Sequence, residues 1–330
     1  MSSARTISVI IPNYNGRQLL EDYLPYTFQT LDETGAAYEV IVIDDCSKDD
    51  SVAFIRQHYP QVKLLQNDKN RGFSYTCNHG IKVAQYELTF LLNSDIKLLP
   101  GYFAPLWKYF DKPDTFGVTG RMIDMEGDRI QDAARMPGFS GYKIKTKYFY
   151  YTETADARTL TFYLSGANAL VSTQKLKAMG GFDEIYSPFY YEDMDLCIRA
   201  WRAGWVCYYD HAAICRHKGS ATTKTIKPGW VKSIYYRNRF FVHAIHLEGF
   251  SRLMWSLQAT FTDVLPKLII GRGWVWKSYK GYLKGGRKVD KSRKQLHKLM
   301  DANNSHVSLQ TLFKRIQQSA AGQNVKQFKA

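Results

Sequence analysis

The chain has 330 residues, of which 45% are hydrophobic and 23% are charged, and its formal net charge is +15. This composition is ordinary for a globular protein, so it excludes disorder of the whole chain. The cationic excess favours an anionic partner such as a nucleotide, a nucleic acid or a lipid surface. Most of the excess lies in one segment, because residues 267–294 contain ten Lys or Arg and a single acid, Asp290.

The cysteines, the N-terminal residues and the apolar runs together favour a cytoplasmic location. The five cysteines are an odd number without a C-x-x-C pair, which argues against a disulfide framework or a zinc knuckle and favours a reducing compartment. The first residues lack the pattern of a secretory signal. No apolar run reaches the roughly 18 to 20 residues that span a bilayer. The longest candidate, residues 253–270, is interrupted by Asp263, Pro266 and Lys267. We therefore expect a cytoplasmic protein.

Strand and helix patterns alternate through the first hundred residues. A β-branched run at residues 7–11 ends at Pro12 and Asn13, which predicts a buried strand that runs into a loop. We expect further strands at residues 39–43, 62–65 and 88–92, and helices at residues 19–31, 51–58 and 78–84. This alternation predicts an α/β domain with a mainly parallel sheet. Ligands bind beyond the carboxyl ends of the strands in such sheets.

The pattern weakens after about residue 120. Residues 138–163 are rich in Tyr, Phe and Lys, which predicts a mobile loop or an insertion that faces the acceptor. Regular elements return at residues 169–179, 192–203 and 206–209.

The chain changes character after residue 228. Apolar residues recur at helical spacing between Phe250 and Leu268, and the basic stretch follows them. One interpretation is a helix packed on the preceding domain, with a solvated basic tail. The other is an interfacial helix that docks on anionic lipid. We expect a domain at residues 1–227 and a helical, basic, membrane-associating extension at residues 228–330.

Polar residues follow two of the expected strands. Asp44 and Asp45 come after the second strand, where a carboxylate could accept hydrogen bonds from a ribose or a base, although turn formation or helix capping is the simpler interpretation of that pair alone. Asp95 follows the fourth strand, with Asn93 two residues earlier, and such oxygens suit Mg²⁺ or Mn²⁺. An ordinary turn is again the alternative. Because two such turns lie on one edge of the sheet, we give the binding site and the ordinary turn equal weight.

Two further groups could take part in chemistry. Glu192, Asp193 and Asp195 are three acids in four residues at an expected helix start. Repulsion between such carboxylates raises one pKa, which suits a general base, whereas the positive end of the helix dipole would give them a purely structural role. His217 stands alone, and a lone histidine is usually a surface or core residue. Its neutral imidazole could instead complete a metal site at Asp95.

Eight short stretches together carry a family resemblance. They lie in order at residues 9–15, 40–47, 70–73, 92–95, 165–170, 180–184, 191–196 and 217–220. With these stretches the chain resembles the family 2 glycosyltransferases of the GT-A fold, especially the bacterial rhamnosyltransferase-like members, across roughly residues 5–222. The resemblance implies a Rossmann-like, mainly parallel central sheet flanked by helices, with the helical C-terminal extension added to it.

The resemblance also implies roles for residues. It assigns nucleotide-sugar binding to Pro12, Tyr14, Asp44, Asp45, Arg71, Asn93, Ser94, Ser165 and Gly166. The segment from Asn93 to Asp95 resembles the D-x-D metal motif of the family, which implies that Asp95 and His217 bind Mg²⁺ or Mn²⁺. The first Asp of that motif is Asn93 here, which alters the ligand set of the metal. Asp193 resembles the catalytic base, with Glu192 as the second candidate.

The expected function is therefore an inverting, metal-dependent transferase of the hexosyltransferase type. It would move a sugar from a nucleotide-diphosphate sugar to a hydroxyl of a saccharide or lipid-linked acceptor, in cell-surface polysaccharide or glycolipid synthesis. We expect it to be peripheral at the inner face of the cell membrane, to contact anionic lipid and to have no nucleic-acid partner.

Two alternatives stand beside this expectation. One is a sugar-phosphate nucleotidyltransferase, for which residues 12–16 are a poor version of the Gly-rich loop that holds a triphosphate. No G-x-x-x-x-G-K-S/T sequence is present, so a P-loop site is excluded. The other is a non-catalytic membrane or nucleic-acid binding module, which leaves the ordered acidic clusters unexplained.

Overall fold

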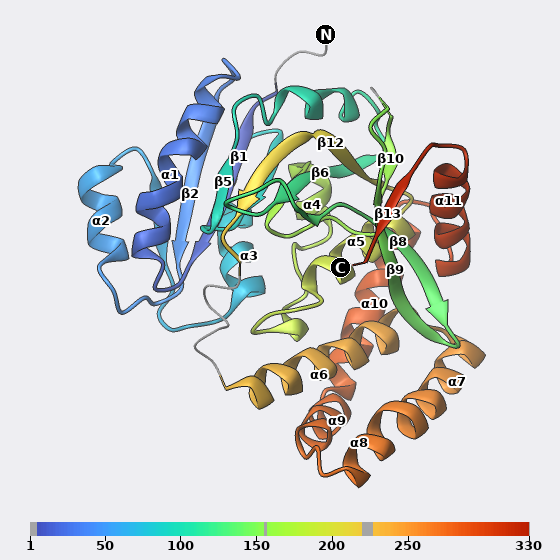
Figure 1. Cartoon of the computed structure of the whole chain (residues 1–330). Coiled ribbons are helices and arrows are strands. Elements are labelled where there is room, and N and C mark those ends of the chain that lie inside the picture. Colours follow the sequence, from blue (N-terminus) through green and yellow to red (C-terminus); the bar gives the residue numbers. More distant parts are fainter. Residues whose placement is uncertain (1–4, 155–156, 220–226, 330) are drawn as a thin grey trace.

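The computed structural model describes residues 5–154, 157–219 and 227–329. The first part of the chain alternates strands with helices (Figure 1). These elements are β1 (Ile7–Asn13), α1 (Arg17–Asp32), β2 (Tyr38–Asp44), α2 (Ser51–His58), β3 (Lys63–Gln66), α3 (Phe73–Val83) and β4 (Leu88–Leu92). The expected alternation is confirmed, and one boundary lies more than two residues from its expected position.

The shifted boundary is the start of α3, which begins at Phe73 rather than at Asn78. Gly72 has a φ of +83°, a backbone conformation that glycine adopts without a steric penalty. The backbone N–H of Phe73 then donates to the carbonyl of Pro188 at 2.8 Å. Helix α3 can therefore begin at Phe73, because the carbonyl of Pro188, far away in the sequence, accepts from the first backbone N–H of the helix.

The middle of the chain completes the sheet. It contains β5 (Ile96–Leu98), η1 (Ala104–Tyr109), β6 (Thr115–Ile123), β7 (Ile130–Asp132), β8 (Ala134–Ser140), β9 (Lys143–Tyr151), β10 (Thr159–Leu160), β11 (Asn168–Ser172), α4 (Thr173–Ala178), η2 (Glu184–Tyr186), α5 (Glu192–Arg202) and β12 (Val206–His217). The strand order is β10-β12-β6-β11-β4-β1-β2-β3, with β5 beside β12 and β7 beside β6. Strands β1 to β4 pair in parallel and β11 is antiparallel to both neighbours, so the sheet is mixed and mainly parallel.

One of the two alternatives for residues 138–163, the mobile loop, was wrong, whereas an insertion that faces the acceptor stays a prediction. Apart from residues 155 and 156, which lie outside the described residues, the segment is largely regular. Strands β8 and β9 form a hairpin, and β13 (Lys326–Phe328) adds to it as a third strand. The aromatic residues that suggested a loop pack instead, since Phe149 stacks on Phe328 and Tyr150 is buried.

Helices form most of the C-terminal part. They are α6 (Pro228–His246), α7 (Gly249–Ala259), a π-helical turn η3 (Thr260–Val264), α8 (Leu265–Ile269), α9 (Trp274–Lys284), α10 (Gly286–Ala302) and α11 (Leu309–Ala321). In Figure 1 helices α6 to α9 lie below the large sheet, while α11 packs against β8, β10 and α5. No helix within the described ranges is both long enough and apolar enough to cross a membrane.

The hydrophobic core is continuous between the sheet and these helices. One cluster of buried side chains includes Val9 and Leu91 of the sheet, Phe240 of α6 and Leu312 of α11. A fully buried side chain packs on several elements at once, which couples their stabilities. The division at residue 228 therefore stays a prediction from composition.

Candidate active site

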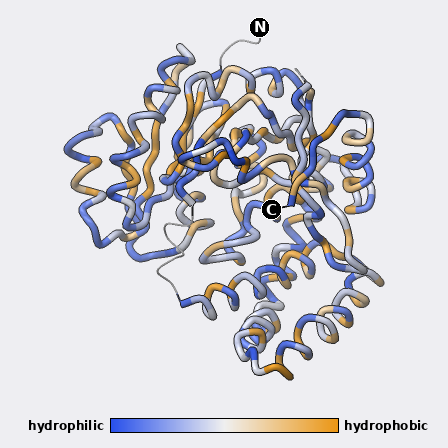
Figure 2. The backbone as a smooth tube through the Cα atoms, viewed as in Figure 1, coloured by the Kyte–Doolittle hydropathy of each residue, from blue (hydrophilic) through white to orange (hydrophobic). Residues whose placement is uncertain are grey.

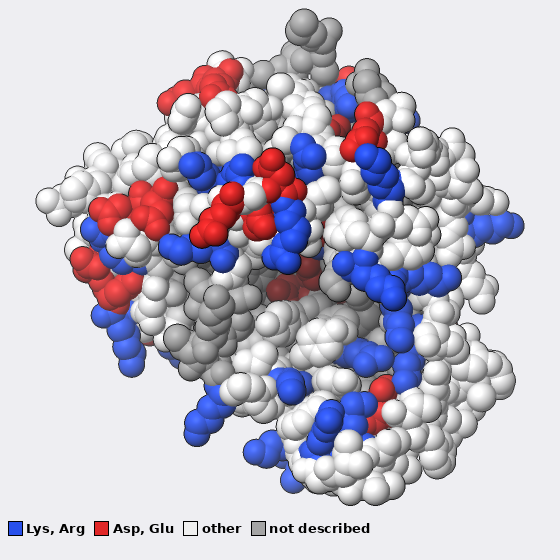
Figure 3. Space-filling view, in the orientation of Figure 1, with Lys and Arg blue, Asp and Glu red and all other residues white. Residues whose placement is uncertain are grey.

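The candidate site lies where three parallel strands end. Strands β1 and β2 pair in register, so that Asn13 stands opposite Asp44, and β4 runs parallel to β1 and ends just before Asn93. This edge is where open α/β sheets bind ligands. Figure 3 shows a hollow in the middle of the viewed face, with acidic residues at its floor and Lys and Arg around it.

Asp44, the last residue of β2, and Asp45, the next residue, both accept hydrogen bonds from other groups of the protein. Asp44 accepts from Nδ2 of Asn13 at 3.0 Å and from the N–H of Ser47 at 2.9 Å. Asp45 accepts from the N–H groups of Arg71 and Gly72, each at 2.8 Å. Both carboxylates are buried. They build the turn and fix the loop before α3, so a contact with a nucleotide remains a prediction for them.

Three other residues predicted for the nucleotide are accessible at the same edge. Tyr14 is exposed, and Pro12 and Arg71 are partly buried. The guanidinium of Arg71 lies 4.7 Å from the centre of the Tyr75 ring and 3.3 Å from Asp68. An aromatic ring and a partly free guanidinium can contact a base and a phosphate, respectively.

The structure brings together the two residues predicted to bind a metal. Asp95 follows β4, His217 ends β12, and β5 connects them because Ile96 pairs with His217. Oδ2 of Asp95 is 3.3 Å from Nε2 of His217. Nδ1 of the same imidazole is 2.9 Å from Oε1 of Gln131 in β7. Ser220, the last residue of the motif around His217, lies outside the described residues.

The donor set fits a hard divalent cation. Because the amide oxygen of Gln131 only accepts, Nδ1 of His217 is the ring nitrogen that donates to it, and Nε2 is the ring nitrogen on the side of Asp95 that could bind a cation. A divalent cation there could bind both the carboxylate oxygen of Asp95 and Nε2 of His217. Within the part of the chain that the structure describes, no group of three or more His, Cys, Asp or Glu side chains could hold a metal. Water and donor phosphate oxygens would complete the coordination, as Mg²⁺ and Mn²⁺ prefer.

A short loop before β11 touches both sides of the site. The carbonyl of Ala167 accepts a hydrogen bond from the N–H of Asn93 at 3.0 Å, two residues before Asp95. A Cβ placed on Gly166 would lie 3.6 Å from Cβ of Asp193 and 3.6 Å from the ring of Phe73. Ser165, at the start of this loop, is buried. Gly166 therefore lies directly beside Asp193 and Phe73.

The acids at the start of α5 lie in a desolvated environment. Burial raises the pKa of Glu192 well above its usual range, and the negative charge of Asp193 adds to the effect. Burial also raises the pKa of Asp193, while the guanidinium of Arg135 opposes the shift. Oε2 of Glu192 is buried without a hydrogen-bond partner, and Asp193 is partly exposed. Asp193 can therefore both meet an acceptor hydroxyl and bind its proton.

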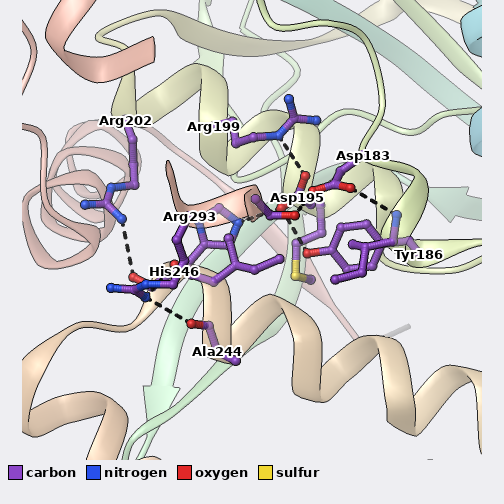
Figure 4. A network of polar contacts seen from close by, with 12 residues as sticks. Asp183, Tyr186, Asp195, Arg199, Arg202, Ala244, His246 and Arg293 are labelled. Atoms are coloured by element: carbon purple, nitrogen blue, oxygen red, sulfur yellow. Dashed lines mark hydrogen bonds and ion pairs between the residues drawn. The ribbon is translucent and has the colours of Figure 1, made fainter. Parts of the chain in front are cut away.

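The third acid of the cluster has a different environment (Figure 4). Asp195 accepts hydrogen bonds from the hydroxyl of Tyr186 at 2.9 Å, from Arg199 at 2.7 Å and from His246 at 2.9 Å. Although burial opposes ionisation, Arg199 and His246 hold the pKa of Asp195 below its usual range. Asp195 is thus an ionised structural anchor between α5 and α6.

The sequence did not reveal several neighbours of the site. Arg135 in β8 forms an ion pair with Asp132, and its positive charge acts on Asp193. Gln131 precedes Asp132 in β7 and contacts His217. Two adjacent residues of β7 therefore contact His217 and the Arg135 side chain that acts on the acidic cluster. Their segment has no apolar periodicity and no family motif, so only the fold reveals them.

A comparison with known proteins identifies the class. The profile of glycosyl transferase family 2 matches residues 8–180. The chain is 25% identical over 250 residues to the N-acetylglucosaminyl-diphospho-decaprenol L-rhamnosyltransferase of Mycobacterium tuberculosis, a match that covers 67% of this chain and 80% of the relative. The protein is therefore a glycosyltransferase of GT-A type that uses a nucleotide-sugar donor. It belongs to glycosyl transferase family 2.

Two solved structures share the fold. One is GalNAc-T7 with UDP, GalNAc and Mn²⁺, which has a TM-score of 0.62 at 15% identity, over 97% of this chain and 57% of the other. The second is the mannosyltransferase PcManGT of Pyrobaculum calidifontis with GDP-Man and Mn²⁺, which has a TM-score of 0.54 at 14% identity, over 98% of this chain and 88% of the other. The predicted GT-A fold is thus confirmed.

Proposed function

We propose that this protein is an inverting, divalent-metal-dependent glycosyltransferase of the hexosyltransferase type, with Asp193 as the general base. It transfers a sugar from a nucleotide-diphosphate sugar to a hydroxyl of a saccharide or lipid-linked acceptor, in cell-surface polysaccharide or glycolipid synthesis. The observation that carries the proposal is the loop 165–167, because Ala167 accepts a hydrogen bond from Asn93 on the side of Asp95 while Gly166 lies next to Asp193 on the other side.

The raised pKa of Asp193 supports its role as the base. The carboxylate accepts the proton of the acceptor hydroxyl as the hydroxyl oxygen forms its bond to the anomeric carbon. The bond from that carbon to the diphosphate breaks on the opposite face, and the nucleoside diphosphate leaves with the bonding electrons. One displacement of this kind inverts the anomeric configuration.

The metal part of the proposal rests on Asp95 and His217. Their oxygen and nitrogen face each other at 3.3 Å and would hold Mg²⁺ or Mn²⁺. When bound, the ion neutralises charge on the diphosphate leaving group. Both structural neighbours were solved with Mn²⁺, and the sugars named for them and for the mycobacterial relative derive from hexoses, which supports a hexosyl donor.

The location forms part of the same proposal. All five cysteines are free, and four of them are buried, which supports a reducing compartment. We place the enzyme in the cytoplasm, peripheral at the inner face of the cell membrane, where a lipid-linked acceptor would be found.

A donor panel tests the binding step. UDP-, GDP- and dTDP-sugars are added with and without Mn²⁺, and the thermal unfolding midpoint is measured. A donor that binds only the native state raises the midpoint by mass action. We expect one nucleotide class to raise it in the presence of Mn²⁺. No shift with any donor, together with no sugar transfer to an acceptor, would refute the proposal.

Two matched variants test the base. Asp193→Asn should keep the donor-induced shift and lower turnover by about 10²-fold or more, the usual scale for a positioned acid–base group. Glu192→Gln should retain much more activity. The opposite pattern would move the base assignment to Glu192, and normal turnover in both variants would remove it from this cluster.

A further inference from the structure

The C-terminal helices carry a second apolar face that the described part of the chain leaves largely exposed, apart from an edge-to-face contact between the rings of Phe250 and Tyr142. Trp255, Ala259 and Val264 point into the core and are buried. On the other side of the same helical segment, large apolar side chains recur every three or four residues and are exposed. This exposed row consists of Phe250, Leu253, Leu257, Phe261, Leu265 and Ile269. A helix that packs only on its own domain needs one apolar stripe, so the second stripe indicates a further binding surface.

The row ends at a protruding turn between α8 and α9. Ile269 and Ile270 at this turn are 84% and 62% exposed, the former being the most exposed large apolar residue of those described. Gly271 has a φ of +71° and reverses the chain there. Trp276, in the first turns of α9, is 48% exposed. Figure 2 shows apolar residues at this lowest point of the molecule, far from the central sheet.

Positive charge surrounds the turn. Residues 264–289 contain seven Lys or Arg and no acid. The preceding acid, Asp263, is buried and bound by Lys143 at 2.7 Å and by Lys267 at 3.4 Å. Negative charge is therefore neutralised beside the apolar row, while Arg272, Lys277 and Lys280 stay exposed around its tip.

We infer that this face, which we call the apolar ridge (Phe250 to Trp276), docks on an anionic lipid bilayer. Exposed isoleucines enter the boundary between headgroups and acyl chains, a tryptophan lies at that boundary, and Lys and Arg contact the lipid phosphates. The surrounding cations favour lipid over a second copy of this cationic chain, because two such faces would repel. The inference rests on the proposed location at the membrane and deepens it, because it names the surface that would hold the enzyme there and bring the site to a lipid-linked acceptor.

Vesicle sedimentation tests the inference with the full chain. Vesicles of phosphatidylcholine alone are compared with vesicles that contain phosphatidylglycerol. We expect the wild type to bind the anionic vesicles, to bind the neutral ones at least tenfold more weakly, and to be released as salt rises because the Debye length shortens. The double variant Ile269→Asp with Ile270→Asp should lose at least tenfold in bound fraction. Equal binding by wild type and double variant, or no binding by either, would overturn the inference.

A charge-matched control separates apolar insertion from a change of net charge. Gln57→Asp with Gln318→Asp adds the same two negative charges at exposed positions of α2 and α11 and should bind like the wild type. Should the isoleucine variant fail to fold by circular dichroism, Lys277→Glu with Lys280→Glu tests the charged rim and should also bind weakly. Normal binding by that variant would likewise overturn the inference.

Two further readouts separate lipid docking from self-association and from catalysis. If the wild type is a dimer without vesicles and the isoleucine variant is a monomer, a second copy covers the ridge and the lipid assignment is wrong. Transfer to a lipid-free acceptor should be unchanged in the isoleucine variant. An enzyme that binds vesicles but transfers no sugar would contradict the proposed function and leave the docking surface intact.

Discussion

At the scale of single residues, one of the two proposed metal ligands, His217, has an unexpected neighbour. Gln131 orients His217 through a 2.9 Å contact with Nδ1. We predict that Gln131→Ala weakens Mn²⁺ binding by about 10- to 100-fold, the usual cost of losing a partner behind a metal ligand. Asp95→Ala should abolish both Mn²⁺ binding and most of the turnover. Calorimetric titration with Mn²⁺ measures the first effect independently of activity.

The exposed Gln295→Ala change in α10 is the control for that titration and should leave Mn²⁺ affinity unchanged. Full turnover of the wild type in excess EDTA would refute the metal assignment as a whole. Metal dependence with an unaffected His217→Ala variant would refute only that ligand.

Glu192 offers a prediction about stability. Its folded pKa is raised, so the unfolded state ionises first and stability falls as the pH rises through the folded pKa. Glu192→Gln removes this penalty, so the variant should be more stable than the wild type at neutral pH. The gain should shrink as the pH falls towards the ordinary carboxyl range, where both states are protonated. Urea unfolding at pH 7.5 and pH 5 measures the difference, and an equal or lower stability of the variant at pH 7.5 would contradict the prediction.

At the scale of elements, α6 shapes the approach to α5. Nδ2 of the fully buried Asn238 donates to the carbonyls of Phe189 and Tyr190, each at 2.9 Å, and to that of Tyr186. These carbonyls belong to the segment that leads to Glu192. We predict that Asn238→Ala lowers the free energy of unfolding by about 1–3 kcal/mol, because buried acceptors lose their donor.

The same variant should lose turnover while it keeps donor binding, since the disturbed segment precedes the proposed base. Asn303→Ala is a matched control, because the Asn303 amide also donates to a backbone carbonyl but is exposed at the end of α10. The control should change stability by less than about 0.5 kcal/mol, as surface substitutions usually do. Equal effects of the two variants would contradict this role of α6.

Elements differed in how far the sequence predicted them. The buried strands β1, β2 and β4 read as short apolar runs, because both faces of a parallel strand are covered. Strands β8 and β9 were missed. They pair with each other across a short turn, but buried and exposed residues do not alternate regularly along either strand, so no period of two marks them in the sequence. Asp95 and His217 were predicted to lie together because each belongs to a motif of the resembled family, whereas Gln131, Arg135 and Asn238 belong to no motif and become visible only in the fold.

At the scale of the whole molecule, the C-terminal helices belong to the catalytic unit as well as to the outer surface. Their inner faces join the common core through Phe240, Trp255 and Leu312. His246 of α6 bonds to Asp195 of α5 at 2.9 Å, so the two parts also share a buried polar network. The sequence left open whether this region packs on the domain or faces lipid. The structure shows the packing, and the exposed side of the same helices motivates the proposed docking.

In the proposed reaction, one displacement assisted by Asp193 transfers the sugar. The most direct measurement is the anomeric configuration of the first product, recorded by proton NMR during turnover with the donor found in the panel. We predict a product whose configuration is inverted relative to the donor, formed at least about 10²-fold more slowly by Asp193→Asn. A product that retains the donor configuration, or one formed at the same rate by that variant, would contradict the account.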